Sequence, residues 1–196
     1  LPEGVDRVVN NENVEHWEPA FVKPQAEGGD SRFNSQVIIQ TENDPVAAKA
    51  AARLAGKHPD SVIVQLDANG RYRVVYGDPA TLSGKLRWQI VGHGRDESVQ
   101  HHTRMSGYSA DELALKLKQF RTDFKQAGSP DHISLVGCSL ISDDKRDGFA
   151  RHFISELDKQ GIRTIVSARS SEVAVDSIGR KFTRNAEEQW VHKLMD

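Results

Sequence analysis

Short apolar segments alternate with amphipathic segments along most of this chain, and this alternation limits the fold more than any other feature. Five segments have the length and the β-branched content of strands: 36–40, 62–66, 85–91, 132–136 and 164–166. Three segments have the apolar spacing of amphipathic helices: 45–57, 109–124 and 145–159. Strands that alternate with helices favour an α/β fold with a mainly parallel sheet covered on both faces.

Further strand-like segments indicate antiparallel pieces at two places. Residues 71–76 follow the strand at 62–66 across Asn69-Gly70, a dipeptide that is typical of tight hairpin turns. Beyond Ser170, three short strand-like stretches follow one another: 173–175, 180–182 and 190–191. We therefore predict a hairpin in the first region and a C-terminal β-flap over 171–196.

The first 34 residues differ from the rest of the chain. They contain Pro2, Pro19, Pro24 and a Gly28-Gly29-Asp30 turn, and they show neither helical nor strand periodicity. A length of 196 residues suits one domain with a sizeable core. We predict an N-terminal arm over 1–34 and a single domain over 35–196.

Composition and charge exclude several classes of protein. The net charge is −2, which argues against a general nucleic-acid-binding protein. A single cysteine cannot form an internal disulfide, and the adjacent His101 and His102, expected in a surface loop, do not make a metal-binding pattern. The longest apolar runs have strand length, and no signal peptide is visible. We therefore expect no membrane segment and no metal, in a chain that is either cytosolic or part of a longer protein.

Two of the predicted strands end in a glycine followed by a reactive side chain: Gly92-His93 and Gly137-Cys138. The carboxyl ends of parallel strands meet at one edge of a sheet, where ligands bind. A histidine there can take the proton of a thiol nucleophile, and glycines leave N–H groups accessible to an oxyanion. The pattern predicts a Cys138–His93 dyad. The alternative is a buried structural cysteine and a histidine that caps its own turn.

A basic face is predicted on the helix at 45–57. At 100° per residue, Lys49, Arg53 and Lys57 fall within an arc of about 80°, and alanines and Leu54 occupy the other side. Such a face is usually only solvated, so anion binding and simple solvation both remain open from the pattern alone.

Several motifs together resemble a known family. They are Ile-Val-Gly-His-Gly-Arg-Asp at 90–96, Ser-Gly-Tyr-Ser-Ala-Asp-Glu-Leu at 106–113 and Val-Gly-Cys-Ser-Leu at 136–140. The similarity extends from about Arg32 to Lys193. The chain resembles the autoprocessing cysteine protease domain of multifunctional autoprocessing repeats-in-toxin proteins.

The resemblance implies a caspase-like α/β fold and an enzyme that autoprocesses its parent toxin. Such domains are activated by inositol hexakisphosphate in the host cell, cut the toxin after leucine and release its effector domains. The family's catalytic pair falls on His93 as acid/base and on Cys138 as nucleophile. Asp44 matches an acidic position that orients the histidine in more distant toxins, although the helix dipole explains a carboxylate there equally well.

The resemblance also implies where the activator binds. Arg180, Lys181 and Lys193 match phosphate-binding positions of the family's flap, and Lys57 and Arg87 match basic positions more loosely. Lys49 and Arg53 join this set only through the basic helix face. Trp190 is a candidate for coupling activator binding to the catalytic site, and an aromatic core anchor is the alternative.

The expected partners are the parent toxin polypeptide as substrate and inositol hexakisphosphate, with no nucleic acid, no metal and a monomeric chain. The expected location is a secreted toxin that acts in the host cytosol. Two other functions remain open from the sequence. One is a non-catalytic inositol-phosphate binding module, and the other is a thiol hydrolase or acyltransferase that acts on small molecules.

Overall fold

A computed structural model gives the fold of most of the chain. It describes residues 13–25, 31–58, 60–97, 102–137, 148–168, 173–175, 177–184 and 190–192. Backbone alone is described within strands at 95–97, 102–103, 173–174, 182–184 and 190–192. Cys138 and Lys193 lie outside the described residues.

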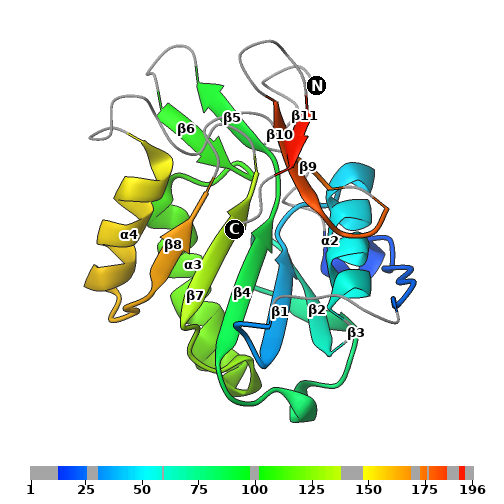
Figure 1. Cartoon of the computed structure of the whole chain (residues 1–196). Coiled ribbons are helices and arrows are strands. Elements are labelled where there is room, and N and C mark those ends of the chain that lie inside the picture. The colour runs from blue at the N-terminus through cyan, green and yellow to red at the C-terminus, as the bar shows by residue number, and fades with distance from the viewer. Residues whose placement is uncertain are drawn as a thin grey trace.

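A mainly parallel sheet forms the centre of the fold (Figure 1). Within the described residues it has six strands in the order β3-β2-β1-β4-β7-β8, and β3 alone runs antiparallel to its neighbour. The strands are β1 (Ser35–Gln40), β2 (Ser61–Leu66), β3 (Tyr72–Tyr76), β4 (Leu86–Val91), β7 (His132–Val136) and β8 (Ile165–Ser167). Every residue of β1, β2 and β4 is buried, as expected for strands covered on both faces.

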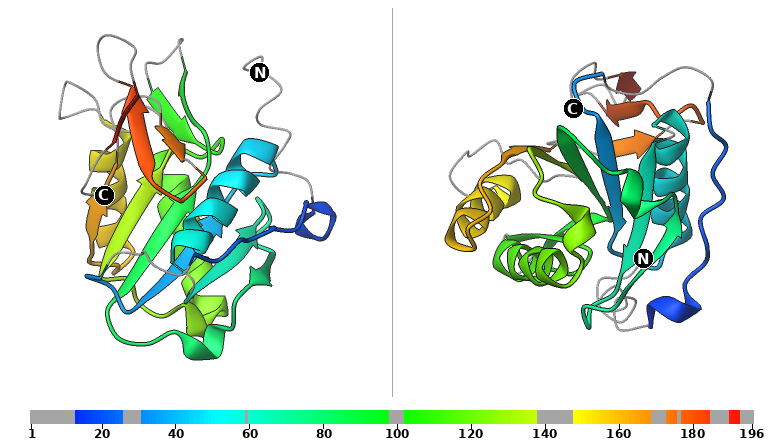
Figure 2. Two further views of the ribbon diagram at one scale, coloured as in Figure 1. Left: turned by 45° about the vertical axis from the view of Figure 1, so that its right-hand side comes forward. Right: turned by 90° about the horizontal axis from the view of Figure 1, so that it is seen from below.

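Helices cover the two faces of the sheet unequally (Figure 2). Helix α2 (Pro45–Lys57) packs on one face through Ala47, Ala51 and Leu54. The helices α3 (Ala110–Asp123) and α4 (Phe149–Lys159) pack side by side on the other face, over a larger core that includes Trp88 and Phe120. This arrangement confirms the prediction of a mainly parallel α/β sheet flanked by helices, and it is consistent with a caspase-like fold.

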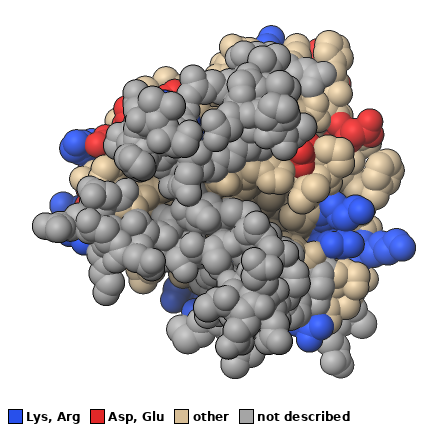
Figure 3. Space-filling model, turned by 90° about the horizontal axis from the view of Figure 1, so that it is seen from above, with Lys and Arg blue, Asp and Glu red and all other residues tan. Residues whose placement is uncertain are grey.

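Local sequence signals set the ends of two helices. Asp44 caps α2 by accepting hydrogen bonds from the N–H groups of Val46 and Ala47, and Pro45 occupies the first turn. Ser109 and Glu112 form a reciprocal capping box at the start of α3. Helix α2 carries Lys49, which is exposed, and Arg53 and Lys57, which are half-buried. Lys and Arg side chains gather on the side of the molecule where α2 lies when it is seen from above (Figure 3).

The N-terminal arm packs against the domain, although the sequence predicted no packed element there. Residues 14–16 form the short 3-10 helix η1 (Val14–His16), and Val14 and Trp17 are buried. The Gln25 N–H donates to the Gly56 carbonyl at 2.9 Å, and a Cβ at Gly56 would lie 2.6 Å from the Lys23 carbonyl oxygen. Glycine at 56 thus lets the arm pass directly over the end of α2. The predicted domain boundary at residue 34 stays a prediction.

A hairpin that the sequence pattern did not predict follows β4. It consists of β5 (Gly94–Glu97) and β6 (His102–Met105), which pair antiparallel from Gly94 opposite Met105 to Glu97 opposite His102. The expectation that His102 lies in a surface loop is therefore wrong, and His101 lies outside the described residues. These strands are rich in charged and polar residues, so no apolar alternation marked them.

A second, smaller antiparallel sheet lies near the C-terminus of the chain. Its strands are β9 (Val173–Val175), β10 (Lys181–Arg184) and β11 (Trp190–His192), with β10 in the centre. The Arg53 guanidinium donates to the Val175 carbonyl at 2.8 Å, which ties α2 to β9. The antiparallel strands agree with the expected positions, and the role of this sheet as a flap stays a prediction.

The polypeptide around Gly92 is packed too tightly for any side chain. Among the described residues, Ser106 is the one non-glycine with a positive φ, 53°, and its hydroxyl contacts the Thr41 hydroxyl at 2.6 Å. A Cβ at Gly92 would lie 1.8 Å from Ser106 Oγ and 2.8 Å from Thr41 Oγ1. The end of β4 is therefore fixed between the end of β1 and the residue that follows β6.

We predict that Gly92→Ala lowers the free energy of unfolding by about 1–3 kcal/mol, because the new methyl group overpacks this buried contact. Adding Ser106→Gly should recover part of the loss, since it removes the colliding hydroxyl and suits the positive φ. Urea unfolding of both variants measures the difference. A double variant that is no more stable than Gly92→Ala would contradict this packing argument.

Candidate active site

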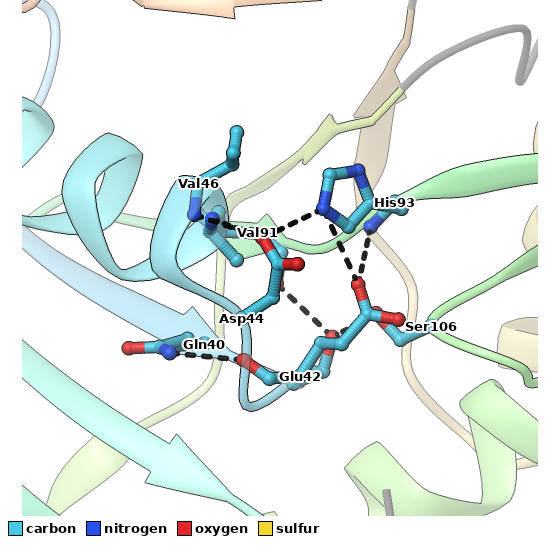
Figure 4. A network of polar contacts seen from close by, with 9 residues as sticks. Gln40, Glu42, Asp44, Val46, Val91, His93 and Ser106 are labelled. Carbon is cyan, nitrogen blue, oxygen red and sulfur yellow. Dashed lines mark hydrogen bonds and ion pairs between the residues drawn. The ribbon is translucent and has the colours of Figure 1, made fainter. Parts of the chain in front are cut away.

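His93 lies two residues beyond the end of β4, and its ring faces the start of α2 (Figure 4). The side chain is 30% exposed, and its Nε2 atom lies 2.9 Å from Asp44 Oδ1. Within the described residues, the polar contacts of the ring are all made by Nε2. The other ring nitrogen, Nδ1, has no polar partner among the described residues.

Asp44 has two structural roles at once. The same Oδ1 atom caps α2 and contacts the His93 ring. Burial raises the pKa of the Asp44 carboxyl, but the hydrogen bond with His93, the backbone N–H groups of Ala47 and Val46 and the His93 charge together outweigh burial and lower it. The two explanations that the sequence left open for Asp44 are therefore compatible: the carboxylate caps the helix and holds the histidine.

Glu42 is a second carboxylate beside His93, and it was not predicted from the sequence. Its side chain is 1% exposed, and Oε2 accepts a hydrogen bond from the His93 backbone N–H at 3.2 Å. On the other side, the Ser106 N–H donates to the His93 carbonyl at 2.8 Å. These two contacts fix the backbone of His93, so Glu42 and Ser106 act as positioning residues.

The contacts around His93 change one expectation about oxyanion binding. The Gly92 N–H donates to the Val136 carbonyl, and the His93 N–H donates to Glu42. Both N–H groups are used by the fold, because β4 pairs with β7 and the loop bonds to Glu42. The Gly92 N–H is therefore not an accessible oxyanion donor, and oxyanion binding by the backbone around Gly137 stays a prediction.

Parallel pairing sets the position at which the chain reaches Cys138. Val91 at the end of β4 pairs with Val136 at the end of β7, and Gly137 is described immediately after it. His93 and Cys138 are each two residues beyond this pair. The strand register and the pocket described below place His93 and Gly137 at the same edge of the sheet, and the predicted Cys138 lies outside the described residues.

A pocket of about 260 Å³ opens beside His93. Most of its wall is apolar, from α2 and from the ends of β4, β7 and β9. It is lined by Pro45, Val46, Ala47, Lys49, Ala50, Arg53, Val91, Gly92, His93, Val136, Gly137 and Val175. The pocket thus brings together the predicted catalytic histidine, Gly137 before the predicted cysteine, and an apolar wall that suits an aliphatic side chain.

Polar side chains interrupt the buried strands on the face of the sheet toward α2. Arg87 is 1% exposed, and its guanidinium contacts Gln36 Oε1 at 3.0 Å and His58 Nε2 at 3.3 Å. Lys181 is also buried, and its ammonium donates to Ser134 Oγ at 3.1 Å. Both residues were predicted to contact the activator, and the structure places both of them on this face. We call Arg87, Lys181 and the end of α2 at Lys57 the basic strip.

Cations also surround one aromatic ring next to Arg87. The charged groups of Arg32, Lys85 and Arg87 lie 5.5, 5.6 and 5.0 Å from the centre of the Phe33 ring. Arg32 and Phe33 were missed as site residues. The signal that could have found this area is a set of polar residues in strands that are otherwise apolar: Gln36, Arg87, Gln89, His132 and Ser134.

The other predicted activator residues lie at different places. Lys57 packs near Gly179, where a Cβ would lie 2.5 Å from the Lys57 Cβ, and Arg180 is exposed beside this turn. Lys49 and Arg53 instead line the pocket at His93. Lys49 lies eight residues before Lys57, about 12 Å along the helix. Their predicted contact with an activator stays untested.

Two predicted residues cannot be placed by their side chains. Trp190 begins β11, of which only the backbone is described, and Lys193 lies outside the described residues. None of the helices in the described part of the chain combines the length and the apolarity that crossing a bilayer requires. Among the same residues, no three His, Cys, Asp or Glu side chains gather as metal ligands would.

The lowered pKa of Asp44 predicts an acid-dependent contribution to stability. A carboxyl whose pKa in the folded chain is below its ordinary 3.8 stabilises the fold above about pH 4, and this contribution is lost as the pH falls through the folded-state pKa. Asp44→Asn keeps a capping side chain but removes the charge, and should cost about 0.5–1 kcal/mol between pH 5 and 7.

Urea midpoints between pH 7 and pH 3 measure this contribution. The midpoints of Asp44→Asn and the parent chain should converge below about pH 4. Asp78→Asn is the matched control, because Asp78 caps the short helix η2 (Pro79–Thr81) through Ala80 and has no histidine on it among the described contacts. A difference for Asp44→Asn that stays constant down to pH 3 would contradict the assigned role of the charge.

Residues 31–184 match the model of the Peptidase C80 family. The chain is 59% identical over 195 residues to Multifunctional-autoprocessing repeats-in-toxin of Vibrio vulnificus, and 59% identical over 192 residues to the protein of the same name from Vibrio cholerae serotype O1.

These alignments cover 97% and 95% of this chain but only 4% of each relative. The chain thus corresponds to a small part of the relatives' length. The match to the family model spans the sheet, the helices and the site around His93. This chain belongs to the Peptidase C80 family of cysteine peptidases.

Proposed function

We propose that this chain is an autocatalytic cysteine endopeptidase that cuts its parent toxin after leucine in the host cytosol and is activated by inositol hexakisphosphate. The observation that carries the proposal is the His93–Asp44 pair at the mouth of an apolar pocket that Gly137 also lines. The names of the two toxin relatives support self-processing.

In the proposed reaction, the Cys138 thiolate attacks the carbonyl carbon of the scissile bond. The tetrahedral intermediate collapses, the C–N bond breaks, and the His93 imidazolium gives its proton to the leaving amine. Water then attacks the thioester with His93 as general base, which releases the carboxylate and returns the thiol. The net change is hydrolysis of one peptide bond.

Asp44 supports this chemistry by orienting His93. Its contact with Nε2 leaves Nδ1 as the ring nitrogen that would exchange a proton with the thiol and the leaving group. Glu42 and Ser106 hold the backbone of the same residue, which fixes the point from which the ring extends. Precise positioning of this kind is worth large factors in rate.

The apolar pocket supports the expected preference for leucine. Val91, Val136 and Val175 contribute branched side chains from three different strands, and the alanines of α2 close one wall. An aliphatic side chain placed there leaves water and gains about 25 cal/mol for each Å² of apolar surface buried. A charged side chain would lose its hydration at that place.

The basic strip supports an anionic activator. Six phosphates on one ring need many charge-assisted hydrogen bonds, and Lys and Arg from several elements can provide them. Lys181 belongs to β10, and its contact with Ser134 reaches β7, whose next residues lead to Cys138. A ligand on Lys181 and Arg87 would favour the docked position of β10, and the Lys181–Ser134 contact would couple that position to β7.

The first test is covalent labelling of Cys138 by a peptide that carries an electrophile after leucine. Labelling should require inositol hexakisphosphate and fall by about 10²-fold or more in His93→Ala, since general acid–base catalysis contributes about 10²–10⁴-fold. Mass spectrometry of the labelled peptide identifies the site. Cys138→Ala should bind the activator without reacting.

Other outcomes would change the assignment. Equal labelling with and without the activator would support the peptidase assignment and contradict allosteric activation. No labelling in either condition, together with tight activator binding, would indicate a binding module without catalysis. Reaction with small thioesters but not with leucine peptides would indicate a small-molecule hydrolase or acyltransferase.

The second test separates the activator site from the catalytic site. Lys57→Gln and Arg180→Gln should each raise the activator concentration for half-maximal labelling about 10- to 100-fold, because a charge-assisted hydrogen bond contributes about 1.5–3 kcal/mol. The labelling rate at saturation should stay near the parent value. Lys125→Gln, an exposed lysine in η3 (Lys125–Ala127), is the control and should change neither quantity. Equal effects of all three variants would contradict the proposed location.

A further inference from the structure

A groove of about 480 Å³ adjoins the pocket at His93. Its walls come from the arm, from α2 and from the turn after β9. It is lined by Glu18, Pro19, Ala20, Phe21, Lys23, Pro45, Ala48, Lys49, Ala52, Arg53 and Ser177. Pro45, Lys49 and Arg53 line both cavities, so the groove continues from the catalytic pocket across the outer side of α2.

The groove is suited to a polypeptide segment with apolar side chains. Its lining is rich in proline and alanine, and the Phe21 side chain is 80% exposed on the arm. Val46, in the wall of the adjoining pocket, is 65% exposed. Large exposed apolar side chains that are bordered by polar residues mark interaction sites. An aromatic side chain such as Phe21 is a common anchor in such sites.

Positive charge predominates in the lining of the groove. Three cationic residues, Lys23, Lys49 and Arg53, line it together with one carboxylate, Glu18. Lys23 and Lys49 are exposed, and Arg53 also bonds to the Val175 carbonyl. Figure 3 shows this concentration of Lys and Arg on the side where α2 lies. The electrostatic complement of this surface is a segment that carries acidic side chains.

We propose that this groove binds the substrate polypeptide next to the scissile leucine and selects acidic residues there, with Lys49 as the specificity-determining residue. The inference rests on the proposed peptidase function. A substrate chain extends by about 3.3 Å per residue, so residues next to a leucine in the pocket must cross the adjoining surface. Lys49 stands at the junction of pocket and groove, and it therefore meets the substrate within a few residues of the leucine.

The test uses fluorescent peptides that contain one leucine with four glutamines on each side. In each peptide of the set, glutamate replaces one of these glutamines. Binding to the full Cys138→Ala chain is measured by anisotropy, with saturating inositol hexakisphosphate present throughout. Glutamate at one or more positions should tighten binding about two- to fivefold, the range expected for exposed ion pairs, and the gain should shrink in high salt.

Charge reversal identifies the residue responsible. Lys49→Glu, in the Cys138→Ala background, should abolish the preference for glutamate and favour lysine at the same position. Lys125→Glu adds the same charge outside the groove and should leave the preference unchanged. A glutamate preference that survives Lys49→Glu, or no preference at any position, would overturn the proposal. Concentration-dependent dimers abolished by Phe21→Ser, without an effect on the peptides, would assign the groove to a second copy and also overturn it.

The same peptides separate this inference from the proposed function. The chain with Cys138 intact is tested for cleavage after leucine. Cleavage without a glutamate preference, in kcat/KM or in binding, would support the proposed peptidase function and contradict the proposed role of the groove. Glutamate-selective binding that depends on Lys49, without cleavage, would retain the groove and reject the peptidase. Both results together, selective binding and selective cleavage, are the expected outcome.

Discussion

The parallel pairing of β1 with β4 is the constraint on which the site depends. The connection after β1 leads to α2 on one face of the sheet, and the connection after β4 leads to α3 on the other face. A crevice forms where neighbouring strands diverge in this way. It is there that Asp44 at the start of α2 meets His93 beyond β4. A shift in this register would separate the two residues.

Tight backbone packing turns this crevice into a fixed site. Thr41, Gly92 and Ser106 meet in a space that admits no further side chain, and Glu42 holds the next backbone N–H. The positive φ of Ser106 is local strain that the surrounding contacts maintain. The residues that position His93 thus come from three separate parts of the chain, and each contributes through backbone geometry or a buried polar group.

The sequence pattern predicted the helices and strands with a clear hydrophobic periodicity, and it missed the features that depend on tertiary contacts. The helix at 45–57 and the strand at 132–136 have the predicted bounds, because caps, proline and apolar spacing act locally. The hairpin of β5 and β6 was missed, because backbone pairing forms it without an apolar pattern. Glu42 was missed because its role depends on burial against a loop 51 residues away. Asp44 was found through resemblance, and the geometry shows why it lies beside His93.

We propose that Cys138 and His93 hydrolyse a peptide bond through a thioester intermediate. Intact-mass analysis of rapidly quenched reactions with a leucyl peptide ester, in the presence of inositol hexakisphosphate, tests it most directly. We expect an acyl adduct on Cys138 that forms before the carboxylic acid product accumulates. Any adduct that forms in His93→Ala should persist longer, because His93 acts as the base in hydrolysis of the thioester. Turnover without an adduct, or an adduct that also forms in Cys138→Ala, would contradict it.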